Sequence, residues 1–286
     1  MQTTIRAGVF VLFYIVSAQI AGWFLSGLSN PLLSGTTVIL ITGVAANLLC
    51  LRIFEGRNLA DCGLWLNSCT GRNLWLGLAG GAAAAAAVLL PPIGLGLAHF
   101  VSLPSEPPTA GSVTFLVAML AAGSIGEELL FRGYGLQILI AAIGPWATIL
   151  PLGILFGALH YGNPGASLLS SAITAGFGIL FGYAYLRSRD LWLPIGLHFG
   201  WNFTLPVFGV NMSGLRIRVT GWELSWSAGD LWSGGEYGPE ASALTLGVLV
   251  LLFFYIRKIP VRRQASPLID PPTEGAVCET SQPLPS

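Results

Sequence analysis

Residues 7–51, "AGVFVLFYIVSAQIAGWFLSGLSNPLLSGTTVILITGVAANLLCL", contain no Asp, Glu, Lys or Arg. An uncharged apolar segment of this length can hold two membrane-spanning helices, because each needs about 20 residues to cross the hydrocarbon core. Pro31, within "SNPLL", marks the turn between them. The segment therefore predicts a pair of transmembrane helices.

The composition of the whole chain agrees with a membrane protein. Of its 286 residues, 53% are hydrophobic and 9% are charged, whereas soluble domains carry about 25% charged residues. We predict an all-α, polytopic transmembrane helical bundle with about eight spans. The "GLQILIAAIG" stretch is too short to cross and is interpreted as an interfacial or re-entrant piece. The predicted spans are 8–28, 33–51, 75–101, 112–131, 145–161, 165–187, 191–209 and 241–257.

The distribution of basic residues predicts the orientation. If the N-terminus is cytoplasmic and the spans alternate, all of the 13 basic residues except Arg216 and Arg218 fall on the cytoplasmic side. Such an asymmetry follows the positive-inside rule. We therefore expect a multi-pass protein of the cell membrane with both termini in the cytoplasm.

Few ionisable residues interrupt the apolar segments. "GEELLFRGY", residues 126–134, carries Glu127, Glu128 and Arg132, "FGALHYGNP" carries His160, and "GLHFGWNFT" carries His198 and Asn202. Ionisable groups inside a membrane are costly, so they face a protein interior or a wet cavity and are candidates for function.

Helical spacing assigns different positions to the two acids. Glu128 and Arg132 are four residues apart, which favours an ion pair on one helical face. Glu127 points about 100° away from Glu128 and is free to project toward another helix. His198 and Asn202 are also four residues apart, so their polar groups share a face.

This set of side chains could hydrolyse an amide. A carboxylate beside an imidazole can deprotonate a water molecule. A second histidine with an asparagine can donate hydrogen bonds to the oxyanion that develops on a carbonyl. The same residue types could also bind a divalent metal that polarises water, although the chain lacks the HExxH helix of most zinc proteases.

Three motifs resemble those of a known family. "EELLFR", "FGALH" and "HFGWN" are similar to the EExxxR, FxxxH and HxxxN/D motifs of the CPBP family, the CAAX-processing and bacteriocin-processing (Abi-type) intramembrane endopeptidases. They occur in the family's order, each on its own predicted helix. The resemblance covers roughly residues 112–205.

The resemblance implies a membrane-embedded protease that opens toward the cytoplasm. It implies that Glu127 activates water with the help of His160 and that His198 and Asn202 stabilise the oxyanion. Glu128 and Arg132 match positions that hold the site together. Both a metal-free glutamate mechanism and a metal-dependent one are described for the family. In the second case Glu127, His160 and His198 would bind a divalent metal such as zinc.

The expected substrate is a membrane-tethered protein or peptide, with prenylated CAAX ends and bacteriocin precursors among the candidates. The lipid bilayer is the other expected partner, and we expect no nucleic acid. A transporter that uses the buried cluster as an ion or proton site is an alternative, although no inverted repeat is visible. A non-catalytic membrane scaffold or immunity protein is another, although it would not require the complete set of motif residues.

The remaining segments complete the predicted organisation. Glycines spaced four apart, Gly77 with Gly81 and Gly178 with Gly182, indicate close helix packing. The tryptophans of the external loop are expected to lie on the headgroups, and the Pro-, Ser- and Thr-rich tail is expected to be disordered. The predicted units are N-terminal transmembrane helices (1–110), a catalytic core (111–209), an external loop (210–240), a last transmembrane helix (241–259) and a disordered cytoplasmic tail (260–286).

Overall fold

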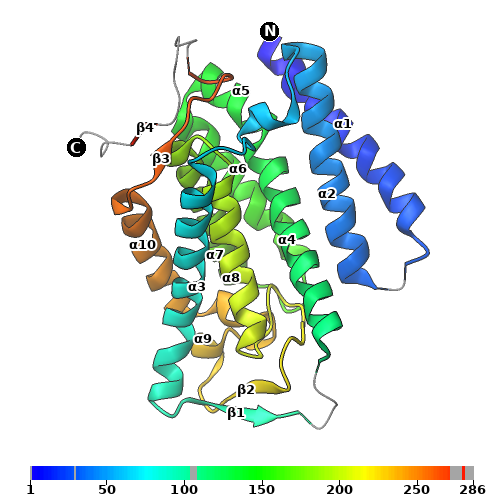
Figure 1. The fold of residues 1–286 in the computed structure, drawn as a ribbon. Helices are drawn as coiled ribbons and strands as arrows, with labels where there is room; N and C mark the ends of the chain where they lie inside the picture. Colours follow the sequence, from blue (N-terminus) through cyan, green and yellow to red (C-terminus); the bar gives the residue numbers. More distant parts are fainter. Residues whose placement is uncertain (1, 29, 104–107, 271–278, 281–286) are drawn as a thin grey trace.

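A computed structural model describes residues 2–28, 30–103, 108–270 and 279–280 as a helical bundle with a few short strands (Figure 1). The helices are α1 (Gln2–Leu25), α2 (Pro31–Cys50), α3 (Thr70–Gly94), α4 (Ala110–Arg132), α5 (Tyr134–Ile143), α6 (Pro145–Leu159), α7 (Leu168–Ser188), α8 (Trp192–Val207), α9 (Asp230–Ser233) and α10 (Ala243–Lys258). The strands are β1 (Ala98–Ser102), β2 (Trp222–Trp226), β3 (Arg262–Arg263) and β4 (Glu279–Thr280).

Every predicted span coincides with a helix, and the short piece before α6 is helix α5. Among the described residues, five helical segments are long and apolar enough to cross a membrane: Gln2–Leu25, Leu32–Glu55, Thr70–Gly94, Ala110–Ile143 and Leu168–Ser188. The other three predicted spans, α6, α8 and α10, contain 15, 16 and 16 residues, fewer than the about 20 that a straight crossing requires. The all-α membrane bundle is confirmed, whereas the count of eight spans is not.

The third predicted span is wrong at its C-terminal end. Helix α3 ends at Gly94, and Ala98–Ser102 instead form strand β1, which pairs antiparallel with β2. Pro91 and Pro92 near the helix end supply no backbone donors. Gly96 then adopts a left-handed conformation with φ of 70°, which glycine tolerates without a steric penalty.

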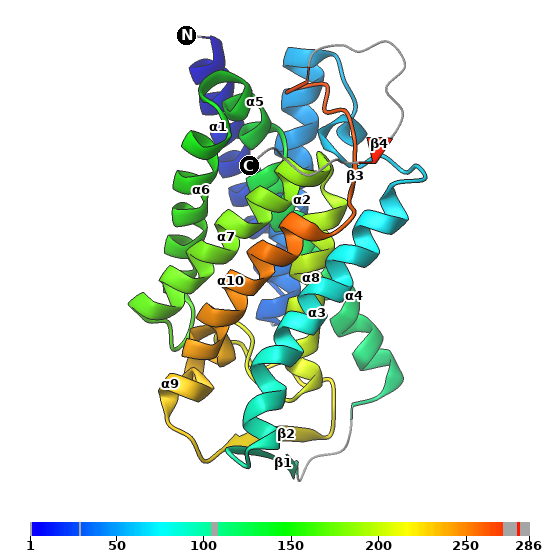
Figure 2. The ribbon, with the colours of Figure 1, turned by 90° about the vertical axis from the view of Figure 1, so that its left-hand side faces the viewer.

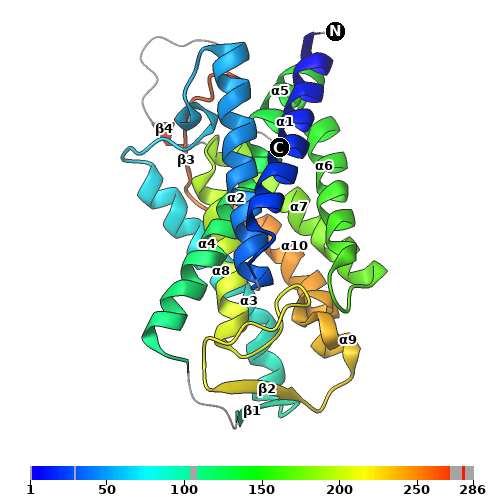
Figure 3. The same cartoon turned by 90° about the vertical axis from the view of Figure 1, so that its right-hand side faces the viewer.

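The segment between α8 and α10, residues 208–242, forms a folded cap on one end of the bundle (Figure 3). It contains β2 and α9, and several of its apolar side chains join the main hydrophobic core. Trp222 and Trp232 remain exposed, so their expected place on the headgroups stays a prediction. The buried apolar residues of the cap are Val210, Met212, Ile217, Val219, Leu224, Tyr237 and Ala241.

The first part of the tail does not match the expectation of disorder. Residues 260–270 lie against the bundle end opposite the cap, where Gln264 Nε2 donates to Asp190 Oδ2 at 2.9 Å and Ser266 Oγ donates to Gln137 Oε1 at 3.1 Å. Asn73 Nδ2 also donates to Asp190, at 2.6 Å, and burial raises the pKa of this carboxyl. Buried polar partners from distant segments therefore order these residues. Residues 271–278 and 281–286 lie outside the described residues.

Helices α3 and α8 pack side by side through glycines (Figures 1 and 2). A Cβ atom on Gly77 would collide with the carbonyl oxygen of Leu193, and one on Gly81 with that of Leu197. The expected packing role of this pair is therefore present. The contact fixes the distance of α8 from α3 and the rotation of α8 about its axis. Helix α8 carries His198.

We expect Gly81→Ala to destabilise the protein by about 1–3 kcal/mol, because overpacking must push α8 away. Gly94→Ala is the matched control in the same helix, since a Cβ there would have no neighbour within 4 Å. Unfolding of the purified protein in mixed micelles measures both variants. Equal stability of the two would show that α3 and α8 do not pack as described.

Candidate active site

Glu127 lies on the side of α4 that faces a cavity, because the neighbouring Gly126 is pressed against α2. A Cβ atom on Gly126 would come within 2.7 Å of Leu40 N and 2.8 Å of Ile39 Cγ2. This close approach fixes the rotation of α4. The Glu127 side chain is 21% exposed, and no hydrogen-bond donor among the described residues reaches its buried Oε2 atom.

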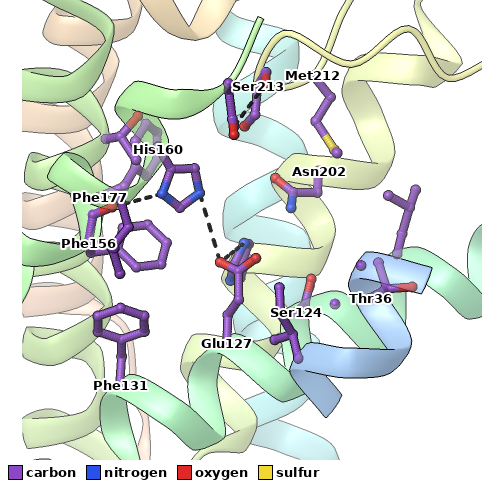
Figure 4. Close-up of a pocket in the computed structure, with 18 of the residues that line it drawn as sticks. Thr36, Ser124, Glu127, Phe131, Phe156, His160, Phe177, Asn202, Met212 and Ser213 are labelled. Atoms are coloured by element: carbon purple, nitrogen blue, oxygen red, sulfur yellow. Dashed lines mark hydrogen bonds and ion pairs between the residues drawn. The ribbon is translucent and has the colours of Figure 1, made fainter. Parts of the chain in front are cut away.

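Two imidazoles from other segments of the bundle converge on Glu127 Oε2, and Figure 4 shows His160 facing Glu127. His160 Nε2 lies 4.0 Å away and His198 Nε2 lies 3.9 Å away. Both separations are too long for a direct hydrogen bond and suit a bridging water molecule. The structure therefore brings the predicted carboxylate and both predicted histidines around one point.

The orientation of His160 is set by its own helix. Helix α6 ends at Leu159, and His160 begins a short 3₁₀ turn, His160–Gly162. His160 Nδ1 lies 2.7 Å from the carbonyl oxygen of Phe156. Because a carbonyl oxygen only accepts hydrogen bonds, Nδ1 donates, and Nε2 faces Glu127.

His198 is held by a buried chain of charges. Its Nδ1 lies 2.9 Å from Glu128 Oε1, and the same oxygen accepts from Arg132 Nη1 at 3.2 Å. Arg132 Nη2 donates to the carbonyl oxygen of Gly178 at 2.8 Å. The expected ion pair between Glu128 and Arg132 is present and fully buried. Its link to His198 was not predicted, since it joins residues 70 positions apart.

Aromatic rings enclose the Arg132 guanidinium. Its carbon Cζ lies 5.0 Å from the ring centroid of Phe156, 5.3 Å from that of Phe181 and 5.5 Å from that of Phe131. Cation–π attraction of this kind stabilises a cation that has left water. Phe181 also stacks on His198, with ring centroids 4.9 Å apart. The same aromatic cluster thus supports the ion pair and the imidazole.

The cavity has a volume of about 420 Å³ and mixed walls. Asn202 lies on its wall one helical turn beyond His198, as the sequence spacing predicts. Most of the wall is apolar and comes from α1, α2, α4, α6, α7 and α8. The apolar lining includes Tyr14, Leu32, Ile39, Leu120, Leu130, Phe131, Phe156, Leu159, Phe177 and Phe181.

Residues of the cap line one part of the cavity, and the expected opening toward the cytoplasm stays a prediction. These residues are Met212, Ser213, Leu215 and Glu240. The cap lies at the end of the bundle opposite the C-terminal ends of α4, α7 and α10 (Figures 1 and 3), and the charge asymmetry placed it outside. The cavity reaches the cap because His160 follows the end of α6 and Asn202 lies in the second half of α8.

Glu240 is a second buried carboxylate on the cavity wall that sequence reasoning missed. Its Oε1 accepts a hydrogen bond from Trp201 Nε1 at 3.0 Å. Its Oε2 accepts from the Oγ of Ser213 at 3.0 Å and from the Ser213 backbone N–H. Burial raises the pKa of Glu240. Its only sequence signal was an acidic residue directly before the last apolar segment.

The candidate metal ligands do not form a ready-made metal centre. Ligands on one zinc ion lie about 2.0–2.2 Å from it, which places neighbouring donor atoms closer together than the 4.0 Å and 3.9 Å measured from Glu127 Oε2 to the two imidazoles. The described part of the chain contains no cluster of three or more His, Cys, Asp or Glu side chains with metal-site spacing.

Comparison with known proteins finds one family that is similar to part of the chain. Residues 109–204 match the family model described as "Type II CAAX prenyl endopeptidase Rce1-like". Searches of curated proteins and of solved structures found no match. The matched segment contains all three motifs, from Glu127 to Asn202. Over residues 109–204, the chain is therefore similar to the Rce1-like family of type II CAAX prenyl endopeptidases.

Proposed function

We propose that this protein is an intramembrane endopeptidase that hydrolyses peptide bonds of membrane-associated proteins or peptides with a water molecule activated by Glu127 and His160. One observation carries the proposal. No donor among the described residues reaches Glu127 Oε2, which lies 4.0 Å and 3.9 Å from the Nε2 atoms of His160 and His198, on the wall of a cavity among membrane helices.

In the first step, a water molecule between Glu127 and His160 attacks the carbonyl carbon of the scissile bond. Glu127 accepts one proton of the water, and His160 Nε2 accepts a hydrogen bond from the other and orients it. The new C–O bond forms as the carbonyl π electrons move to the oxygen. The product is a tetrahedral oxyanion.

In this mechanism, Asn202 and His198 stabilise the oxyanion. Asn202 Nδ2 donates from the cavity wall. The Nδ1 atom of His198 donates to the Glu128 carboxylate. His198 therefore carries a proton on both ring nitrogens when Nε2 also donates a hydrogen bond. In the final step, the C–N bond breaks and Glu127 returns its proton to the leaving amine. One water is consumed, and one carboxyl and one amine are formed.

The apolar lining supports a membrane-associated substrate. Tyr14 and Leu32 bring α1 and α2 into the wall, beside helices whose outer faces suit lipid. A peptide anchored in the bilayer, such as a prenylated CAAX-type end, would present its backbone to Glu127 without leaving the membrane. We place the substrate in this class.

Asn202→Ala is expected to lower kcat by about 10²–10³-fold, the usual effect of removing one oxyanion donor, with little change in KM. The assay uses a quenched fluorescent peptide carrying a lipid anchor, with the full chain in nanodiscs. Thr204→Ala is the control, since Thr204 lies on the same helix and its hydroxyl donates to the backbone carbonyl of Gly200, one turn earlier.

The same assay separates the protease from its alternatives. A protease releases the peptide fragment, and the variant does so slowly. If the wild-type protein leaves the anchored peptide intact and an Asn202 variant changes ion flux in proteoliposomes, the results point to a transporter and contradict the proposal.

A further inference from the structure

We propose that Glu240 is a positioning residue whose carboxylate clamps the cap onto the active site and thereby sets the relative placement of His160 and Asn202. The kinetic part of this inference rests on the proposed function, whereas the structural part does not. Each oxygen of the carboxylate holds a different element of the site.

The first oxygen holds α8. Glu240 Oε1 accepts from the indole Nε1 of Trp201, directly before Asn202 and three residues after His198. The Trp201 ring is buried and lies against Phe177 with ring centroids 4.7 Å apart. The hydrogen bond holds the indole N–H of Trp201, and Phe177 holds its ring. These two contacts fix the rotation of α8 about its axis, and with it the direction in which Asn202 points.

The second oxygen holds the turn that begins with His160. Glu240 Oε2 accepts from the backbone N–H and Oγ of Ser213. The carbonyl oxygen of Ser213 accepts from Asn163 Nδ2 at 3.1 Å, and Asn163 N donates to His160 O at 3.1 Å. A continuous chain of hydrogen bonds therefore runs from the carboxylate to the His160 turn.

Ser213 adopts a backbone conformation that requires such support. Its φ is 49°, in the left-handed region that non-glycine residues rarely adopt. A strained residue of this kind persists only where its surroundings hold it in place. The three hydrogen bonds at Ser213, two to Glu240 and one from Asn163, supply that constraint.

The backbone around Glu240 is anchored at the start of α10. Thr245 Oγ1 donates to Pro239 O at 2.6 Å, and Ser242 Oγ accepts from Thr245 N at 3.2 Å as the cap of the helix. Glu240 is only 8% exposed. It thus joins α8, α10 and the His160 turn at one buried point on the cavity wall.

A glutamine cannot reproduce this arrangement. Its amide has one accepting oxygen, whereas the –NH₂ group only donates. Glu240→Gln must therefore leave either the Trp201 indole or the Ser213 donors unpaired, with almost no change in volume. The matched control is Glu236→Gln, which changes an exposed cap carboxylate that makes no side-chain hydrogen bond among the described contacts.

Hydrogen–deuterium exchange on the full chain in nanodiscs tests the clamp without any substrate. We expect Glu240→Gln to accelerate exchange at residues 159–166 and 211–215, and Glu236→Gln to leave both segments as in the wild type. Faster exchange confined to residues 239–241, or equal exchange in the two variants, would overturn the inference.

Kinetics test the effect on catalysis. We expect Glu240→Gln to lower kcat by about 10–100-fold, the loss that a small misplacement of catalytic groups causes, with a smaller change in KM. Unchanged kcat together with faster exchange would overturn the positioning role. If the wild type cleaves no peptide, the proposed function fails, and the exchange experiment still decides the clamp.

Trp201→Phe provides a second route: its own loss of kcat tests the clamp if Glu240→Gln does not fold, and its combination with Glu240→Gln tests the coupling if both variants fold. It removes the Nε1 donor and keeps an aromatic ring against Phe177. The combined variant should lose less kcat than the product of the two single losses, because both act on one hydrogen-bond network. Strictly multiplicative losses would show that Trp201 and Glu240 act independently and would contradict the clamp.

Discussion

Glu127→Gln is expected to lower kcat by about 10²–10⁴-fold, the contribution of a general base. The amide that replaces the carboxylate cannot accept a proton from water. Because no donor among the described residues reaches Glu127 Oε2, the substitution removes no structural hydrogen bond there. Folding stability should therefore remain close to that of the wild type while activity is lost.

The control for this experiment is Glu236→Gln, which makes the same chemical change at an exposed position of the cap. Initial rates on the anchored peptide and thermal unfolding are measured for both variants. Cleavage by Glu127→Gln within about tenfold of the wild-type rate would remove Glu127 as the base. A large loss of stability instead would assign it a structural role.

Arg132→Met is expected to destabilise the protein by about 3–5 kcal/mol, the cost of leaving the partner of a buried ion pair uncompensated. Glu128 would remain fully buried with His198 as its only polar partner among the described residues, and Gly178 O would lose its donor. Unfolding in mixed micelles measures this loss. The control is Arg257→Met, which removes an exposed arginine at the end of α10.

The double variant Glu128→Gln with Arg132→Met distinguishes the effect of an unpaired buried charge on stability from the effect of lost side-chain packing. Replacing both members of a buried pair costs much less than removing one, so part of the stability should return. Activity should not return, because a neutral amide orients His198 less strongly than a carboxylate does. Equal stability of Arg132→Met and Arg257→Met would show that the ion pair does not hold the bundle together.

Contacts set by local helix geometry could be predicted from the sequence. The four-residue spacing of Glu128 and Arg132 on an apolar helix specified an ion pair, and the spacing of Gly77 and Gly81 specified a close helix contact. The long apolar segments specified the membrane class. The motif resemblance directed attention to Glu127, His160 and His198, and the structure places them around one cavity.

Contacts that depend on the tertiary fold could not be predicted. The hydrogen bond between Glu128 and His198 joins two helices far apart in sequence, and Glu240 reaches Trp201 only because the cap folds back onto α8. Residues 98–102 looked like a helix end because their partner strand lies more than 100 residues later. Such pairing has no local periodic signal.

Single-turnover hydrolysis in H₂¹⁸O tests most directly whether a water molecule in this cavity is the nucleophile. With enzyme in excess over the anchored peptide, the account predicts that the new carboxyl group carries one ¹⁸O atom and that Glu127 gains none. A product whose new carboxyl oxygen is unlabelled, with ¹⁸O appearing in Glu127, would show attack by the carboxylate itself and contradict the account.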